Sequence, residues 1–277
     1  MFKDYRYRLI RKINEFRCRL ISRNQKNIFS NEDIGHLTIF HDYEGEYAGN
    51  GLRDISYKGV NKILDIEAKY QIKATYNIVG KLINDVPEVI ARIVSDGHEI
   101  ASHSYDHSIM TTLSKDAIIS DIQRTRGVFK SIGMELRGFR SPQSRWNFKQ
   151  MGILLDQGIN WSAEADKIKF PYVLKQRTGR FLVRMPVIMD DWGYQSRKVE
   201  PEVMLEMLVD TVNKIAHKKV YGAIGFHPWV QGLDDRRLDV FERFMEKISQ
   251  REDIKITTFE GMHRFFTATS KQQETIK

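Results

Sequence analysis

Two histidines separated by three residues give the sharpest chemical signal in the sequence. They are His103 and His107, in the segment HEIASHSYDH that follows a short apolar run. Two neutral imidazoles and one carboxylate form a typical catalytic zinc site, which leaves one coordination position open for water. The same spacing also occurs by chance between surface histidines, so the pair predicts a metal site only if a carboxylate converges on it.

A second apolar run, residues 37–42, ends in carboxylates. The segment LTIFHDYEG places Asp42 and Glu44 two residues apart. Side chains with this spacing on an extended strand lie on the same face, so both carboxylates could reach one metal site.

A third histidine and an arginine follow two further apolar runs. In GFHPWV, His227 precedes Pro228, which restricts its backbone to extended geometry. A histidine of near-neutral pKa can protonate a departing amine, although a core histidine bonded to backbone is the alternative. In GFRSPQSRW, Arg140 could keep a catalytic aspartate ionised, and an ordinary ion pair is the alternative. Glu164 or Asp191 could pair with Arg140 or with His227, and the sequence does not choose between them.

The elements between these residues alternate in character, with apolar runs followed by amphipathic stretches. This alternation predicts parallel strands joined by helical crossovers. Each polar group discussed above follows a predicted strand, and in a β/α barrel the carboxyl ends of the strands build the active site. The predicted strands are 37–42, 73–79, 99–102, 136–140, 159–162, 181–186, 222–226 and 254–258. The predicted helices include 86–95, 115–132, 201–217 and 236–250.

The composition is that of a soluble globular protein. The 277 residues suffice for one large α/β domain, and the single cysteine, Cys18, excludes an intrachain disulfide. No apolar run approaches the roughly 20 residues of a membrane span, and the first residues lack the apolar segment of a secretory signal. We therefore expect a cytoplasmic protein.

The positive charge is concentrated in residues 1–30. Of the formal net charge of +8, this segment contributes +7 through nine basic and two acidic residues. Its apolar residues have helical spacing, which predicts a basic amphipathic helix that could lie on an anionic membrane surface. The alternative is a helix packed on its own domain with a solvated charged face. Nucleic-acid binding is not expected, because the rest of the chain offers no basic stripe.

These motifs resemble those of the polysaccharide deacetylases, the nodulation-protein-B-like domain of carbohydrate esterase family four. The resemblance covers roughly residues 35–265. DGHEIASHSYDH is similar to the second motif of the family, GFRSP to the third and IGFHP to the fifth. The family's first motif usually holds two adjacent aspartates, whereas Asp42-Tyr43-Glu44 is similar to a variant with one residue between the carboxylates. Gln143 stands where an aromatic residue is common, and the fourth motif is degenerate.

The resemblance implies a role for each residue. His103, His107 and Glu44 would bind a divalent metal, most simply zinc, and Asp42 would be the catalytic base. Arg140 would orient Asp42, and His227 would be the general acid. In the alternative register, Asp42 is the metal ligand and His41 stands in the position of the base. Three tryptophans near the same strand ends, Trp161, Trp192 and Trp229, are predicted to contact the substrate.

The sequence thus predicts a distorted (β/α) barrel of about seven parallel strands, with the active site at the carboxyl ends of the strands. Residues 1–30 form a basic helical extension, residues 31–267 the deacetylase-like catalytic domain, and residues 268–277 a polar, frayed tail. The expected activity is metal-dependent removal of acetyl from an N-acetylated sugar, in a glycan or a lipid-linked glycan precursor. The alternatives are hydrolysis of small cyclic amides or ureides, and a non-catalytic, membrane-associated glycan-binding protein. The partners would be the carbohydrate and an anionic membrane at the inner face.

Overall fold

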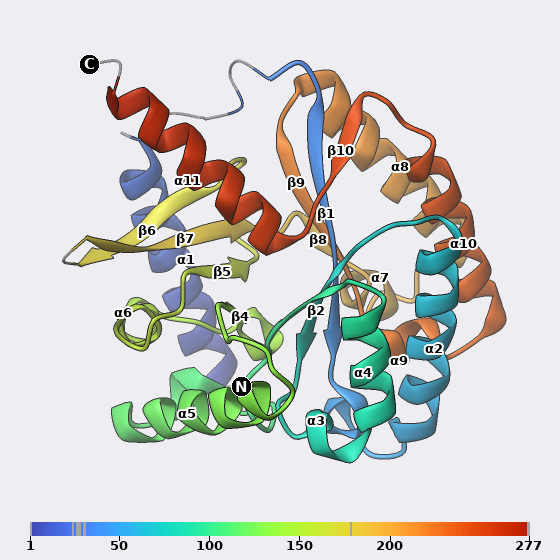
Figure 1. The fold of residues 1–277 in the computed structure, drawn as a ribbon, viewed down its shortest axis with the longest axis horizontal. Coiled ribbons are helices and arrows are strands. Elements are labelled where there is room, and N and C mark those ends of the chain that lie inside the picture. The colour runs from blue at the N-terminus through green and yellow to red at the C-terminus, as the bar shows by residue number, and fades with distance from the viewer. Residues whose placement is uncertain (1, 24, 26–28, 30–31, 178, 276–277) are drawn as a thin grey trace.

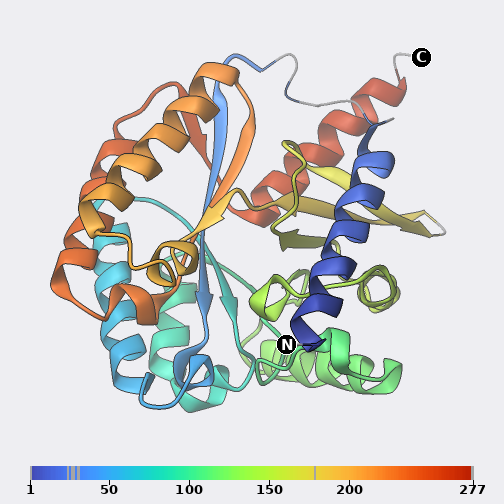
Figure 2. The ribbon, with the colours of Figure 1, turned by 180° about the vertical axis from the view of Figure 1, so that it is seen from behind.

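A computed structural model describes residues 2–275 except 24, 26–28, 30–31 and 178. Within this part of the chain, one curled sheet has the strand order β6-β7-β5-β4-β3-β2-β1-β9-β8, and β10 pairs with β1 (Figures 1 and 2). The strands are β1 (Gly35–Tyr43), β2 (Thr75–Ile78), β3 (Glu99–Ser102), β4 (Gly138–Arg140), β5 (Trp161–Glu164), β6 (Tyr172–Arg177), β7 (Arg180–Pro186), β8 (Met189–Asp190), β9 (Tyr221–Phe226) and β10 (Ile254–Ile256). All pairings are parallel except β6 with β7. The predicted distorted barrel is confirmed.

Helices pack around the sheet, and α11 packs against its inner side. They are α1 (Phe2–Arg23), α2 (Arg53–Lys69), α3 (Leu82–Asp85), α4 (Pro87–Ser95), α5 (Lys115–Ser131), α6 (Phe148–Asp156), α7 (Trp192–Gln195), α8 (Pro201–Lys218), α9 (Pro228–Gln231), α10 (Asp235–Ser249) and α11 (Phe259–Thr275). Three helix starts follow from the sequence: Pro87 and Pro201 occupy the first turns of α4 and α8, and the Ser114 hydroxyl accepts a hydrogen bond from the Ala117 N–H at 3.2 Å.

Two hydrophobic clusters hold this arrangement together. The larger cluster lies between the sheet and the outer helices and includes Ile39, Ile63 and Phe241. The smaller cluster lines the inside of the curled sheet, where α11 contributes Phe259 and Met262. Both faces of the central strands β1 and β2 are buried, so these strands show no alternation of buried and exposed residues, and their polar residues need buried partners.

Each of the eight predicted strands corresponds to an observed strand, and two strands escaped prediction. β6 has the sequence YVLKQR, whose second half is polar and exposed, so it lacks the pattern of a buried strand. It is held by antiparallel pairing with β7, which periodicity does not reveal. β8 has two residues and is too short for a pattern. α11 continues to Thr275, so the described part of the tail predicted at 268–277 is helical, and residues 276–277 of that prediction lie outside the described residues.

The contact between α2 and α9 leads to a stability prediction. A Cβ added to Gly59 of α2 would lie 1.9 Å from the Pro228 carbonyl oxygen. We expect Gly59→Ala to lower the free energy of unfolding by about 1–3 kcal/mol, because two backbones would have to separate. The matched control is Gly127→Ala on α5, which meets nothing within 4 Å and should raise stability by up to about 1 kcal/mol. Urea denaturation measures both, and equal midpoints would contradict the close packing of α9.

Candidate active site

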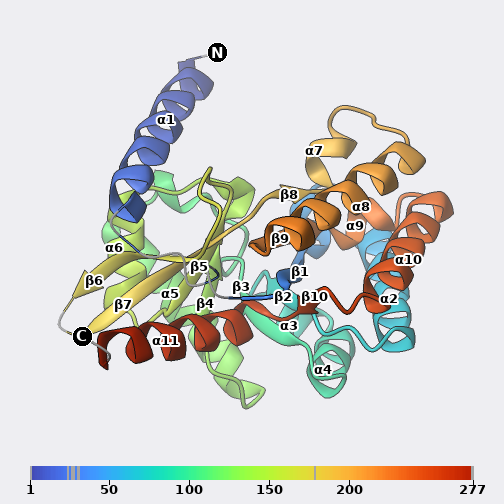
Figure 3. The ribbon, with the colours of Figure 1, turned by 90° about the horizontal axis from the view of Figure 1, so that it is seen from above.

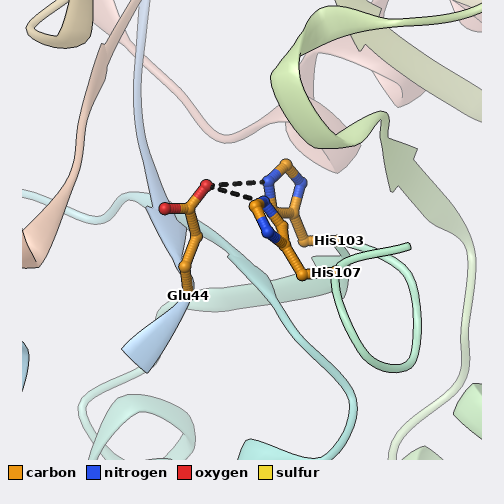
Figure 4. A group of neighbouring side chains, drawn as sticks. All are labelled: Glu44, His103 and His107. Atoms are coloured by element: carbon orange, nitrogen blue, oxygen red, sulfur yellow. Dashed lines mark ion pairs between the residues drawn. The ribbon is translucent and has the colours of Figure 1, made fainter. Parts of the chain in front are cut away.

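Three side chains converge on one point at the carboxyl ends of β1 and β3 (Figure 4). The Glu44 Oε1 atom lies 3.0 Å from His107 Nε2 and 3.4 Å from His103 Nε2. One ligand atom from each residue lies within 4.8 Å of the other two. The structure therefore brings together the three residues predicted to bind metal.

The hydrogen bond of His103 selects the tautomer that suits metal binding. Its Nδ1 lies 3.0 Å from the carbonyl oxygen of Arg140, so Nδ1–H donates to that oxygen and Nε2 presents a lone pair. The Nε2 atoms of His103 and His107 are both buried and lack a hydrogen-bond partner of acceptable geometry. Two buried imidazole nitrogens that face one carboxylate, without a well-aligned hydrogen bond to it, fit a divalent cation shared among the three groups.

The loop that carries the two histidines has unusual backbone geometry. Ser104 and His107 have φ angles of 64° and 63°, in the left-handed region that non-glycine residues rarely adopt. The Asp121 carboxylate on α5 anchors this loop by accepting the Tyr105 N–H at 3.0 Å. Burial raises the pKa of Asp121 to about 6, although the hydrogen bond from Tyr105 opposes this. Strain maintained by such an anchor is typical of functional sites.

Asp42 lies beside this ligand group and is fixed by two donors. Its Oδ1 accepts the side-chain amide of Asn77 at 2.8 Å, and its Oδ2 accepts Arg140 Nε at 3.1 Å. Burial raises the pKa of Asp42, but the charges of Arg140, His103 and His227 outweigh that effect and lower it. The carboxylate is thus held ionised, as a proton acceptor must be.

His41 lies on the opposite face of β1. Its Nε2 is 2.7 Å from Glu67 Oε1, and its ring packs against Tyr76 and Phe241 between the sheet and the outer helices. The side chain is fully buried there. Because neighbouring residues of a strand point to opposite faces, His41 cannot share a water molecule with Asp42. This geometry favours the register with Asp42 as base and Glu44 as ligand.

Arg140 is the centre of a buried ionic network. Besides Asp42, it donates to the Ser144 hydroxyl at 2.6 Å and lies 3.4 Å from Glu164 and 3.5 Å from Asp190. Burial lowers the pKa of Arg140, but the surrounding carboxylates raise it. A planar guanidinium with this many fixed partners has one orientation, so it positions Asp42 as well as neutralising it.

His227 forms the second buried pair of the site. Its Nδ1 lies 2.6 Å from Asp191 Oδ1, and its Nε2 lies 3.7 Å from Asp42 Oδ2. Asp191 also accepts the His227 backbone N–H at 3.0 Å and the Gln231 amide at 2.7 Å. Burial lowers the pKa of His227, but the charge and hydrogen bond of Asp191 outweigh it and raise the pKa to about 10. The structure thus pairs Asp191 with His227 and Glu164 with Arg140, a choice that the sequence left open.

This pair predicts a shifted pH profile for Asp191→Asn. An amide removes the charge that keeps His227 protonated, so its pKa should fall from about 10 toward or below its ordinary value. If protonated His227 is required, the alkaline limb of kcat/KM should move down by several pH units. The matched control is Asp239→Asn on exposed α10, which should keep the wild-type limb. An unchanged limb in Asp191→Asn would remove His227 from the role of acid.

The three predicted substrate-binding tryptophans have different environments. Trp161 is fully buried inside the sheet against Phe259, so its prediction as a substrate contact is wrong: its side chain points into the barrel core. Trp192 and Trp229 pack together with ring centroids 5.7 Å apart beside the site. Trp229 also donates its indole N–H to Glu44 Oε2 at 3.0 Å, which fixes the orientation of that carboxylate.

Sequence reasoning missed Asn77 and the donor role of Trp229. Asn77 lies directly opposite Asp42 in the parallel register of β1 and β2. The signal for it was available, since a lone amide in the buried run TYNI requires a polar partner. No sequence signal distinguishes an indole that donates to Glu44 from one that stacks on a sugar.

Comparisons with known proteins agree with this arrangement. Residues 54–160 match the family model described as polysaccharide deacetylase, a stretch that includes His103, His107 and Arg140. The peptidoglycan-N-acetylmuramic acid deacetylase PdaA of Bacillus subtilis is 28% identical over 132 residues, which is 46% of this chain and 46% of PdaA. The matched stretches span less than half the length of the first curated relatives.

Solved structures are similar over most of the chain. One assigned to a polysaccharide deacetylase from Mycobacterium smegmatis has a TM-score of 0.78 at 19% identity, covering 87% of this chain and 93% of that one. A Puue allantoinase also has a TM-score of 0.78, at 18% identity, covering 89% and 95%. At such identities the likeness establishes the fold alone. Residues 54–160 thus match the polysaccharide deacetylase family in sequence, and the chain as a whole shares the fold of these solved structures.

Proposed function

We propose that this protein is a metal-dependent N-deacetylase that removes acetyl from an N-acetylated sugar. The observation that carries the proposal is the placement of an ionised carboxylate, Asp42, and a protonated imidazole, His227, beside the group formed by Glu44, His103 and His107. Amide hydrolysis needs a base for water, an acid for the leaving amine and a stabiliser for the oxyanion.

Each residue of the proposed site has a defined task in the reaction. Asp42 accepts the proton of the attacking water, and Arg140 and Asn77 hold its carboxylate in one orientation. His227 donates the Nε2 proton to the departing amine, while Asp191 fixes Nδ1–H and the ring plane. Trp192 and Trp229 offer apolar ring faces beside these groups, and we assign them to substrate contact.

Glu44, His103 and His107 would hold the metal, and we assign zinc because one carboxylate and two imidazoles are a typical catalytic zinc set. When bound, the metal would act as a Lewis acid on the acetyl carbonyl and lower the pKa of water. The hydrogen bond from His103 Nδ1 and the bond from Trp229 to Glu44 orient two of the ligands for it.

The substrate class is proposed from the names of the relatives. Relatives are named as peptidoglycan deacetylases, which act on N-acetylated sugars. We infer a glycan or a lipid-linked glycan precursor as substrate here.

We place the reaction in the cytoplasm, in keeping with a single, buried cysteine and no disulfide. Fractionation of cells that express the protein tests this location. Recovery of the protein in the extracellular or cell-wall fraction would refute it.

A substrate panel tests the function. The full chain, supplied with zinc, is incubated with chito-oligosaccharides, peptidoglycan fragments, a lipid-linked N-acetylglucosamine and a cyclic ureide such as allantoin. We expect acetate and free amine from at least one acetylated sugar, and loss of this activity after chelation. Ureide hydrolysis without acetate release would favour the alternative reaction on this fold. Glycan binding by the zinc-loaded protein without any release of acetate would refute the proposal that it is an enzyme.

A further inference from the structure

An apolar stripe on α1 faces solvent. Leu9, Ile13, Phe16 and Leu20 follow one another at spacings of four, three and four residues, so they lie on one face of the helix. Their exposed fractions are 52%, 49%, 63% and 52%. A helix packed on its own domain normally turns such a stripe toward the core. Here the stripe is the side that the domain leaves uncovered.

The opposite face of α1 attaches the helix to the barrel. Asn14, Cys18 and Ser22 are buried, and the Asn14 amide donates to the Trp146 carbonyl oxygen at 2.9 Å. Glu15 is the acidic residue in the described side chains of α1, and it pairs with Lys167 of the barrel at 3.0 Å. Asn14, Cys18 and Ser22, together with the partly buried Ile21, therefore dock the helix, and no residue of the apolar stripe belongs to the core cluster.

Basic side chains border the stripe on both sides. Lys12 and Arg19 lie along one edge and Arg17 along the other, and all three are exposed. The Arg17 guanidinium also lies 3.9 Å from the Phe148 ring centroid, which holds it at that edge. An apolar strip bordered by cations matches a bilayer surface, where acyl chains lie beneath anionic headgroups.

We propose that this face of α1, defined by Leu9, Ile13, Phe16 and Leu20 with Lys12, Arg17 and Arg19, docks on an anionic lipid bilayer. A second copy of the chain fits less well, because pairing two stripes would bring basic edges against basic edges. Among the described residues, none of the helices has the length and hydropathy of a membrane-spanning segment.

The helix that carries the docking face lies near the active site. Figures 2 and 3 show α1 and α7 on the same side of the sheet. Arg11 and Asn14 of α1 line a pocket together with Gln143 and Ser144, and the Ser144 hydroxyl accepts a hydrogen bond from Arg140. Asn14 belongs to the docked face of α1, so a bilayer on the stripe would lie across the helix from this pocket. The proposed docking does not depend on the deacetylase reaction, although it would favour a lipid-linked substrate.

Vesicle flotation of the full chain tests the proposal. The vesicles contain phosphatidylcholine alone or with 30% phosphatidylglycerol, the mixture being a design choice on the order of natural anionic membranes. We expect flotation with anionic vesicles and at least tenfold less with neutral ones. Ile13→Gln/Phe16→Gln should weaken binding at least tenfold, because the apolar contact is lost. Lys12→Gln/Arg19→Gln should weaken it about tenfold and reduce its salt dependence.

Matched controls change similar residues elsewhere. Val203→Gln/Met207→Gln removes two exposed apolar side chains of α8, and Lys62→Gln/Lys247→Gln removes two exposed charges. Both should float like wild type, and circular dichroism should show native helix content in all variants. Wild type that stays unbound, or equal flotation of wild type and the Ile13→Gln/Phe16→Gln variant, would overturn the proposal. So would a wild-type dimer in sedimentation velocity that Ile13→Gln/Phe16→Gln dissociates, since a second copy would then cover the stripe. Acetate release from soluble substrate is measured separately and tests the proposed function.

Discussion

Replacing Asp42 by Asn lowers turnover by on the order of 10² or more and leaves the metal content intact. The amide cannot accept a proton from water, which is the reason for the loss. Asn still fills the same volume between Asn77 and Arg140, so the fold should be preserved. Steady-state acetate release measures the effect, and a zinc assay on the same preparation measures the metal.

The control for this variant is Asp65→Asn, which changes an exposed carboxylate of α2 in the same way. It should retain wild-type turnover. A loss of less than about fivefold in Asp42→Asn would contradict a role for Asp42 as general base, by comparison with the usual contribution of such a base. A denatured Asp42→Asn protein would be recognised by its unfolding curve and would call for Asp42→Ser in its place.

Replacing His227 by Ala lowers turnover on amide substrates by on the order of 10². An amine is a poor leaving group unless it is protonated, and the Nε2–H of His227 is the donor that faces Asp42. An acetyl ester, whose leaving alcohol needs less assistance, should suffer a smaller loss. Asp42→Asn should affect amide and ester alike, because both reactions require activated water.

We measure kcat/KM of each variant with an N-acetyl and an O-acetyl sugar. The result is the ratio of the loss on the amide substrate to the loss on the ester substrate. Equal losses on amide and ester in His227→Ala would contradict the role of leaving-group acid. They would indicate that His227 orients Asp42 or substrate instead. Glu246→Gln on the exposed face of α10 serves as the control and should change neither rate.

The positions of the main site residues were predictable because of one topological rule. Asp42 and Arg140 lie at the carboxyl ends of β1 and β4, His103 and His227 directly follow β3 and β9, and parallel strands bring such residues to one edge. The rule does not say which partner each residue meets. Asp191 pairs with His227 because β8 and β9 are neighbours, and Glu164 pairs with Arg140 because β5 and β4 are neighbours, an order of strands that the sequence does not show.

Burial was the harder property to predict. Trp161 and Trp192 both lie near strand ends, yet Trp161 points into the barrel and Trp192 is half-exposed. Trp161 begins β5 and lies at the end of the strand away from the site, whereas Trp192 begins the short helix α7, and the predicted strand bounds did not separate these two positions. The same difficulty applies to α1: its amphipathic pattern correctly predicts a helix, but not that the polar face would dock and the apolar stripe would face outward. Periodicity identifies a helix and its faces, whereas the surface it meets is set by other segments.

Metal analysis of wild type, Asp42→Asn and Glu44→Gln, carried out side by side after dialysis, tests the central claim most directly. With Glu44, His103 and His107 as ligands, wild type and Asp42→Asn should each retain roughly one zinc ion per chain. Glu44→Gln should lose most of its metal, because a neutral amide replaces the carboxylate that both histidines face. The reverse result, with metal lost from Asp42→Asn and kept by Glu44→Gln, would contradict this assignment of the site.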